Sequence, residues 1–286
     1  MNENLLIGTC SWNYPSWVGD VYTRTQKRSV DYLPEYAQKY RTVEIDSWFY
    51  KMPERAEVIS YRAAVDPGFV FSAKVPQEIC LTHLRPAADP QRGKLGPANP
   101  GFLSPQLFQT FLDRVEPLLP QLGAIMLEFE YLSKAKMPSP QFFLDQLDQF
   151  LNHLPPGLPI AIEPRNADYL VKDYFELLAK HGAAHVFSEK LFLPHIWELF
   201  AEFKDLISDR AVIRLLGDDR KAMEELTKNR WDKVVVDRPE KANVVGMIDE
   251  MLNRRIRVLV NVNNHYEGAS PSTIRFIEGE LYKLRG

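Results

Sequence analysis

The chain has 286 residues, a formal net charge of -3 and 26 % charged residues, which are the proportions of an ordinary globular protein. The near balance of charge gives no global field for extended nucleic-acid binding, although it leaves room for a local basic groove. No apolar run approaches the roughly 18 residues of a membrane span. Two cysteines, Cys10 and Cys80, make no disulfide framework, and the first residues lack the features of a signal peptide. We therefore expect a cytoplasmic protein.

Short β-branched or apolar runs alternate with segments of helical spacing along the chain. Strands are expected at 5–9, 42–46, 69–75, 124–129, 160–163, 184–188, 212–216 and 257–263, and helices between them and after the last. Eight such units predict an α/β fold, a single (β/α)8 TIM-like barrel that spans residues 1–286 as one domain. An open doubly wound sheet is the alternative, but no Gly-x-Gly-x-x-Gly follows the first strand.

The prolines have two expected places. Ser-Pro pairs at 104–105, 139–140 and 270–271 predict helix starts, because serine caps a helix and proline suits its first turn. The segment Arg85–Leu103 is rich in Pro and Gly and is longer than most structureless connections. It follows the third strand, so we expect a long loop at the mouth of the barrel, the end where such folds hold their active sites.

Polar side chains mark the C-terminal ends of the expected strands. Because side chains alternate along a strand, one set should face inward: Glu44, Asp46, Lys74, Glu128, Glu163, Arg214, Asn261 and Asn263. Arg165, His83 and His265 follow on loops, and Trp12 lies near the first strand end. Carboxylates and cations together predict either a self-neutralising ion-pair network or a pocket for a polar, anionic ligand. Gly268–Pro271, at a helix start after the last strand, suits a phosphate or a simple cap.

Several groups of residues match one known family. They are Ile7–Trp12 with Trp17, Gly19 and Tyr22; Tyr36-Ala37; Val43–Asp46; Phe49-Tyr50 with Pro53; Phe69–Lys74; Ala161–Asn166; and Asn263–Gly268. The chain resembles the DUF72, or YecE-like, family along essentially its whole length. The resemblance implies a TIM-like barrel, in agreement with the strand count, and no particular activity. The sequence departs from the family pattern at Asp46, at Leu127–Phe129 and at Arg214–Gly217, where a histidine is often found.

Other chemistries can be weighed against these residues. A divalent Mn, Zn or Mg site would draw on Glu44, Glu128, Glu163, His83 and His265, although no tight metal-binding spacing is present. A glycosidase would need two carboxylates such as Glu128 and Glu163. Lys74 could form a Schiff base, but ion pairing with Glu44 is the expectation. Cys10 is expected to be a buried packing residue.

These observations favour an enzyme, a hydrolase or an isomerase or lyase, that acts on a small anionic substrate at the barrel mouth. The substrate would be a phosphorylated sugar-like or nucleotide-like molecule. Glu44, Glu163 and Lys74 are the expected catalytic residues; Arg165, Arg214, Asn263, His265 and Trp12 are the expected substrate-binding residues. The alternative is a non-catalytic barrel that binds a ligand or a partner and uses its ion pairs for stability.

Overall fold

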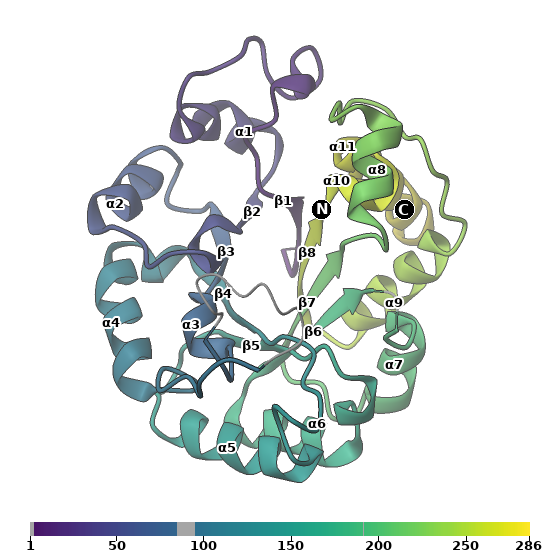
Figure 1. The fold of residues 1–286 in the computed structure, drawn as a ribbon. Coiled ribbons are helices and arrows are strands. Elements are labelled where there is room, and N and C mark those ends of the chain that lie inside the picture. Colours follow the sequence, from purple (N-terminus) through teal and green to yellow (C-terminus); the bar gives the residue numbers. More distant parts are fainter. Residues whose placement is uncertain (1–2, 85–94, 191) are drawn as a thin grey trace.

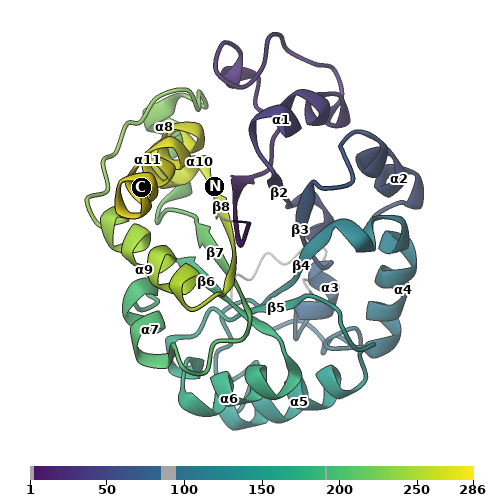
Figure 2. The ribbon, with the colours of Figure 1, turned by 180° about the vertical axis from the view of Figure 1, so that it is seen from behind.

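The computed structural model describes residues 3–84, 95–190 and 192–286. Eight parallel strands close into a barrel in chain order, and Figures 1 and 2 show the helices as a ring around it. The strands are β1 (Leu5–Cys10), β2 (Thr42–Ile45), β3 (Val70–Lys74), β4 (Leu122–Glu128), β5 (Ile160–Glu163), β6 (Ala184–Glu189), β7 (Arg210–Leu215) and β8 (Arg257–Val262). Pairing of β8 with β1 closes the barrel and confirms the predicted fold.

The helices follow the strands in alternation. They are α1 (Leu33–Lys39), α2 (Arg55–Ala63), α3 (Gln77–Cys80), α4 (Pro105–Val115), α5 (Pro140–Asn152), α6 (Lys172–His181), α7 (Ile196–Phe203), α8 (Arg220–Thr227), α9 (Lys241–Asn253), α10 (Asn264–Glu267) and α11 (Ser270–Arg285). The sequence analysis did not predict α3, α8 and α10. The first and last are single turns, and α8 is short, with Met223 and Thr227 as its buried residues.

Two separate hydrophobic clusters show that each strand points alternate side chains outward to the helices and inward to the barrel interior. Ile160 and Ile162 of β5 belong to the large cluster between barrel and helices, whereas Ala161 belongs to a small inner cluster. The inner cluster consists of Leu6, Ala124, Met126, Ala161, Ala184, Val186, Val212 and Leu259. The expected alternation is therefore confirmed. The inner residues nearer the C-terminal strand ends are polar and long, which places their charged groups at the mouth.

All three Ser-Pro pairs begin helices as predicted. Ser104 and Ser139 are N-caps, and their side chains accept hydrogen bonds from the backbone N–H groups of Leu107 and Phe142 at 3.2 and 3.1 Å. At the third pair α11 begins with Ser270 itself, so the N-cap is Ala269 and not the serine. The Ser270 hydroxyl instead donates to Asn264 Oδ1 at 2.8 Å and joins α11 to α10.

Part of the expected mouth loop can be described. Arg85–Lys94 lies outside the described residues, while 95–103 returns alongside the end of the preceding segment. Ala98 forms an antiparallel bridge with His83, and Asn99 N–H donates to Thr82 O at 2.9 Å. The Asn99 amide also donates to Leu81 O at 2.6 Å. This part of the loop is thus held by backbone and amide bonds.

Candidate functional site

Arg214 of β7 lies at the centre of the barrel mouth. Its side chain is 2 % exposed, and it reaches carboxylates from three other strands. Nε and Nη2 donate to the two oxygens of Glu44 at 2.8 and 2.7 Å, which is the bidentate geometry that suits a carboxylate. Nη1 donates to Glu163 at 2.6 Å and to Glu128 at 2.9 Å. One guanidinium therefore ties together β2, β4, β5 and β7.

Lys74 of β3 is the second cation of this network. Its ammonium lies 2.5 Å from Asp46 Oδ1 and 2.9 Å from Glu128 Oε2, with Glu44 at 4.0 Å. Asp46 follows β2 rather than ending it, and its backbone has already turned to helical angles. The Asp46 carboxylate still reaches Lys74, so the expected grouping of these residues is confirmed.

Arg165, on the loop after β5, is the third cation. Its Nη2 lies 2.9 Å from one oxygen of Glu128 and 2.9 Å from Glu163 Oε1. Neither contact has hydrogen-bond geometry, and Glu163 Oε1 is a buried oxygen without a hydrogen-bond partner. The side chain of Arg165 is 17 % exposed, against 0 % for Glu163. Arg165 thus lies between the buried network and the solvent, and it is held less tightly than Arg214.

The charges set the protonation states within the network. Burial and Arg214 lower the pKa of Lys74, but the carboxylates around it raise that pKa further, so the net value lies above the ordinary one. Lys74 is an ammonium at neutral pH, and a Schiff-base amine is not the state that this environment favours. Burial raises the pKa of Glu128, yet its three cationic neighbours, Lys74 first, bring the net pKa far below its usual range.

Cys10 of β1 belongs to the same layer and is not activated. Its thiol lies 3.6 Å from Glu44 Oε2, and Cys10 as a whole is 3 % exposed. Burial, and then the negative charge of Glu44, raise the pKa of the thiol well above its ordinary value. A nucleophilic cysteine needs the opposite shift, so the expected packing role is the one that the surroundings support.

A hollow of about 870 Å³ opens beside Arg165. Its walls are Tyr131, Arg165, Ala167, Asp168, Lys190, Phe192 and Leu193, which follow β4, β5 and β6. Lys190 directly follows β6 and donates to Gly217 O at 3.5 Å. Within the described ranges, no carboxylate lies within ion-pair distance of Lys190. Burial, and then the positive charge of Arg165, lower the pKa of Lys190.

Asn263 and His265 lie on the β8 side of the mouth. The strand that was expected to end at Asn263 stops one residue earlier, at Val262, and Asn263 caps α10. Its Oδ1 accepts from the His265 backbone N–H at 2.8 Å and contacts His265 Nδ1 at 2.5 Å. Because the backbone N–H can only donate, this oxygen is an acceptor, and Nδ1 carries the ring proton. Burial, and then the charge of Arg220, lower the pKa of His265.

The remaining expected ligand residue, Trp12, lies in the hydrophobic core. It is 3 % exposed, its indole N–H donates to Ser29 O at 2.8 Å, and its ring meets Tyr61 edge-on at 5.3 Å. Both its ring and its polar atom are engaged by the protein. The ring therefore offers no open face to a ligand in this structure.

Comparison with known proteins identifies the family. A family model described as "Protein of unknown function DUF72" matches residues 6–284. The chain belongs to the DUF72 family. Among curated relatives, the UPF0759 protein YecE of Escherichia coli strain K12 is 24 % identical over 180 residues, which are 62 % of this chain and 54 % of that protein. YecE of strain O157:H7 matches equally. The match thus spans about half the length of these relatives.

Solved structures of DUF72 proteins have the same fold. A family member from Thermotoga maritima MSB8 superimposes with a TM-score of 0.64 at 18 % identity, over 98 % of both chains. A second, from Enterococcus faecalis V583, gives 0.62 at 17 % identity, over 97 % of both chains. At these identities the likeness shows the fold alone. The DUF72 membership and the closed barrel confirm the family resemblance and the fold class expected from the sequence.

The residues named for a metal site are not arranged as metal ligands in the described part of this DUF72 barrel. In the described part of the chain, no group of three His, Cys, Asp or Glu side chains is placed to hold a metal ion. Glu44, Glu128 and Glu163 converge, but they converge on Arg214. His83 Nδ1 is instead paired with the Thr82 hydroxyl at 2.9 Å.

Two residues of the DUF72 mouth were missed by the sequence analysis. Ser188 Oγ lies 3.4 Å from Arg165 Nη1, and Lys190 lines the hollow. The signal was present, because Ala184 and Val186 face inward and the same alternation carries Ser188 and Lys190 toward the mouth. The expected strand ends at Ser188, two residues before Lys190, whereas β6 extends to Glu189.

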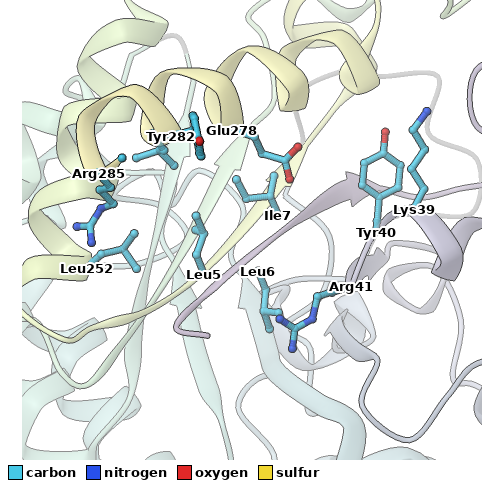
Figure 3. Close-up of a pocket in the computed structure, with 12 residues that line it drawn as sticks. Leu5, Leu6, Ile7, Lys39, Tyr40, Arg41, Leu252, Glu278, Tyr282 and Arg285 are labelled. Carbon is cyan, nitrogen blue, oxygen red and sulfur yellow. The ribbon is translucent and has the colours of Figure 1, made fainter. Parts of the chain in front are cut away.

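A second cavity, of about 480 Å³, lies at the opposite end of the DUF72 barrel (Figure 3). Leu5 and Ile7 of β1 form its wall together with Tyr40 and with Glu278 and Tyr282 of α11. These residues lie near the start of β1 and the end of α11. This is the N-terminal face of the barrel, which serves stability in TIM barrels. None of the ion-pair network reaches it. Separately, no helix among the described residues is long and apolar enough to cross a membrane.

Proposed function

We propose that this DUF72 barrel is an enzyme that binds a small anionic substrate, phosphorylated and sugar-like or nucleotide-like, at its C-terminal mouth. The proposal rests on one observation: in the described part of the chain, Lys190 has no carboxylate within ion-pair distance. It lines the same hollow as Arg165. Burial, and then the charge of Arg165, lower the pKa of Lys190, and an anion between these two cations would offset both effects.

The other charges of the mouth support this placement. Lys74 and Arg214 are buried as well as surrounded by carboxylates within 3 Å, whereas Arg165, which also contacts two carboxylates, is 17 % exposed. Arg165 and Lys190 both line the hollow at the mouth. A hollow of about 870 Å³ is within the size range of small-molecule sites. We therefore assign the anion to Arg165 and Lys190, and we assign Arg214 to holding the network together.

Glu163 is the carboxylate that we assign to proton transfer. Glu163 Oε2 is bound to Arg214, but Oε1 has no hydrogen bond and faces Arg165 at 2.9 Å. If Arg165 turns toward a bound anion, Oε1 becomes the free end of a buried carboxylate next to the substrate. Glu44 is less suited to proton transfer, because Arg214 occupies both of its oxygens. Its role, and that of protonated Lys74, would be electrostatic.

The alternative is a non-catalytic barrel, and one observation favours it. Every carboxylate of the network has a cation within 3 Å, which is the arrangement of a structural network. Such a barrel would bind a ligand in the hollow and leave it unchanged.

Calorimetric titration with inorganic phosphate, ribose 5-phosphate and adenosine 5′-monophosphate tests the proposal. We expect the wild type to bind at least one of them, and Lys190→Gln to bind it about tenfold more weakly or worse, as loss of a charged contact implies. Lys283→Gln is the matched control, because Lys283 is an exposed lysine near the end of α11. Absence of binding to all three probes, or equal binding by Lys190→Gln, would overturn the proposal.

Phosphorus NMR of the bound mixture separates the two interpretations. Conversion of the probe by the wild type and its loss in Glu163→Gln support the enzyme. Tight binding without conversion supports the non-catalytic barrel.

We also propose a cytoplasmic location. Cys10 and Cys80 are both free and buried, which is the usual state of cysteines in a reducing compartment.

A further inference from the structure

Two aromatic side chains stand open to solvent at the hollow beside Arg165. Tyr131, on the loop after β4, is 65 % exposed, and Phe192, on the loop after β6, is 87 % exposed. Both line the same hollow as Arg165 and Lys190, and the β5 loop that carries Arg165 lies between theirs in the barrel order. Large aromatic side chains are normally among the most buried, so two of them at one charged hollow call for a physical reason.

Neither ring is covered by another ring. In the described part of the chain, no aromatic side chain stacks on Tyr131 or Phe192, whereas most of the other rings pack in pairs. Their faces are therefore available to a ligand that enters the hollow. Ala167 and Leu193 add small apolar surface beside them.

The backbone at Phe192 is strained. Its φ is +76°, in the left-handed region that favours glycine and costs other residues free energy. A side chain that packed into the core would offset this cost, but the Phe192 ring is almost fully exposed. Backbone strain of this kind is retained mainly at functional sites, where the position of a side chain matters. The strained residue here carries an aromatic ring at the rim of the hollow, two residues after Lys190.

We propose that the ligand carries a planar aromatic group beside its anionic group, as a nucleoside monophosphate does and a sugar phosphate does not. The anion would lie against Arg165 and Lys190, and the ring against Phe192 and Tyr131. Stacking on aromatic side chains is a general means of holding a base, and it needs no specific hydrogen bonds. This inference rests on the proposed function, because it names the substrate class of the same hollow.

Asp168 gives the hollow one acidic wall. Its Oδ1 accepts from Asn166 Nδ2 at 3.3 Å, and its carboxylate lines the hollow. A carboxylate repels a phosphate, so we place the phosphate at the Arg165 and Lys190 side. The Asp168 carboxylate can accept hydrogen bonds from amino and hydroxyl groups, which a nucleoside carries on its base and its ribose.

The test compares adenosine 5′-monophosphate with ribose 5-phosphate by calorimetric titration. Both carry the same phosphate on a ribose, so the base is the main difference. We expect the wild type to bind the nucleotide about tenfold more tightly, as one stacked base implies. In Phe192→Leu, which keeps an apolar side chain but removes the ring, this preference should fall by several-fold, with ribose 5-phosphate affinity unchanged. Tyr282→Leu is the control, because Tyr282 is 77 % exposed but lines the cavity at the opposite end.

The outcomes separate the two proposals. Equal affinity for the two compounds overturns the aromatic inference and leaves the anion site standing. A nucleotide preference that survives in both Phe192→Leu and Tyr131→Leu also overturns the inference. If neither compound nor inorganic phosphate binds, both proposals fail together.

Discussion

Arg214 and Glu44 form a bidentate ion pair between two strands that are not neighbours in the barrel. The donor nitrogens of Arg214 on β7 lie 2.8 and 2.7 Å from the Glu44 oxygens on β2, and β8 and β1 lie between these strands. Both side chains are essentially inaccessible to solvent. The ion pair therefore crosses the barrel interior at the mouth. A shorter side chain at position 214 would leave the buried carboxylates unpaired.

Arg214→Met should be one of the most damaging single changes to stability. It leaves Glu44 and Glu163 buried without their main cation, and removal of one partner of a buried ion pair costs about 3–5 kcal/mol. Urea unfolding of wild type and variant measures the difference. Arg28→Met is the control, because Arg28 pairs with Asp31 on the surface, where solvent screens the pair and it contributes little to stability.

A rescue experiment checks the cause. Adding Glu44→Gln and Glu163→Gln to Arg214→Met removes the unpaired charges, so the triple variant should recover part of the lost free energy of unfolding. If Arg214→Met is as stable as Arg28→Met, the network does not hold the barrel together as argued.

The arrangement of the strands and the grouping of the mouth charges could be predicted from the sequence. A strand has a side-chain period of two, so Glu44, Lys74 and Glu163 could be assigned to the inner face without any knowledge of distance. The closed order of the strands then brings these residues together. Which atoms pair could not be predicted, because Arg214 meets Glu44 across 170 positions of sequence.

The loop residues were harder to predict for a physical reason. Beyond a strand end, side-chain direction follows turn geometry rather than alternation. Asn263 illustrates this, since one residue after β8 it already caps α10. Trp12 was assigned to the ligand from its position near β1, but the chain turns at Ser11, which has a φ of +72°, and the ring packs in the core.

Arg165→Gln should separate ligand binding from stability. Arg165 contacts Glu128 and Glu163 without hydrogen-bond geometry and is partly exposed, so its loss should cost only about 1 kcal/mol of folding free energy. If Arg165 holds the anion, the same change should abolish phosphate binding in calorimetry.

Glu163→Gln should likewise leave a folded protein, with conversion of the probe lost. Loss of stability alone in both variants would instead identify the network as structural.

His185 gives the barrel a pH dependence of stability. It is 4 % exposed, its Nδ1 lies 2.9 Å from the Tyr174 hydroxyl, and burial lowers its pKa to about 3. The unfolded chain binds a proton near pH 6.5, but the folded protein does so only near pH 3. Stability from this residue is therefore present above pH 6.5 and is lost as the pH falls. The loss is about 2 kcal/mol by pH 5.

The variant His185→Phe isolates that contribution. Without the imidazole, the fall in unfolding free energy between pH 7 and pH 5 should shrink by about 2 kcal/mol. His153→Phe, at an exposed position after α5, should keep the wild-type pH dependence. Parallel pH profiles for wild type and His185→Phe would show that His185 is not buried in its neutral form.

Gly217→Ala should damage both the fold and the proposed anion site. Gly217 has a φ of +78°, and a Cβ there would lie 2.1 Å from His265 O, which is backbone and cannot swing aside. The carbonyl of Gly217 also accepts the hydrogen bond from Lys190. Left-handed strain and the clash together should cost about 3 kcal/mol. Displacement of the Gly217 carbonyl should also weaken phosphate binding in calorimetry.

Gly157→Ala is the matched control for this change. Gly157 has a φ of +80°, but nothing lies within 4 Å of the added carbon, so only the backbone strain remains. That variant should lose about 1 kcal/mol in urea unfolding and should bind phosphate like the wild type. Equal losses in the two glycine variants would mean that the β7 loop moves freely away from His265. Lys190 would then be held by something other than the Gly217 carbonyl.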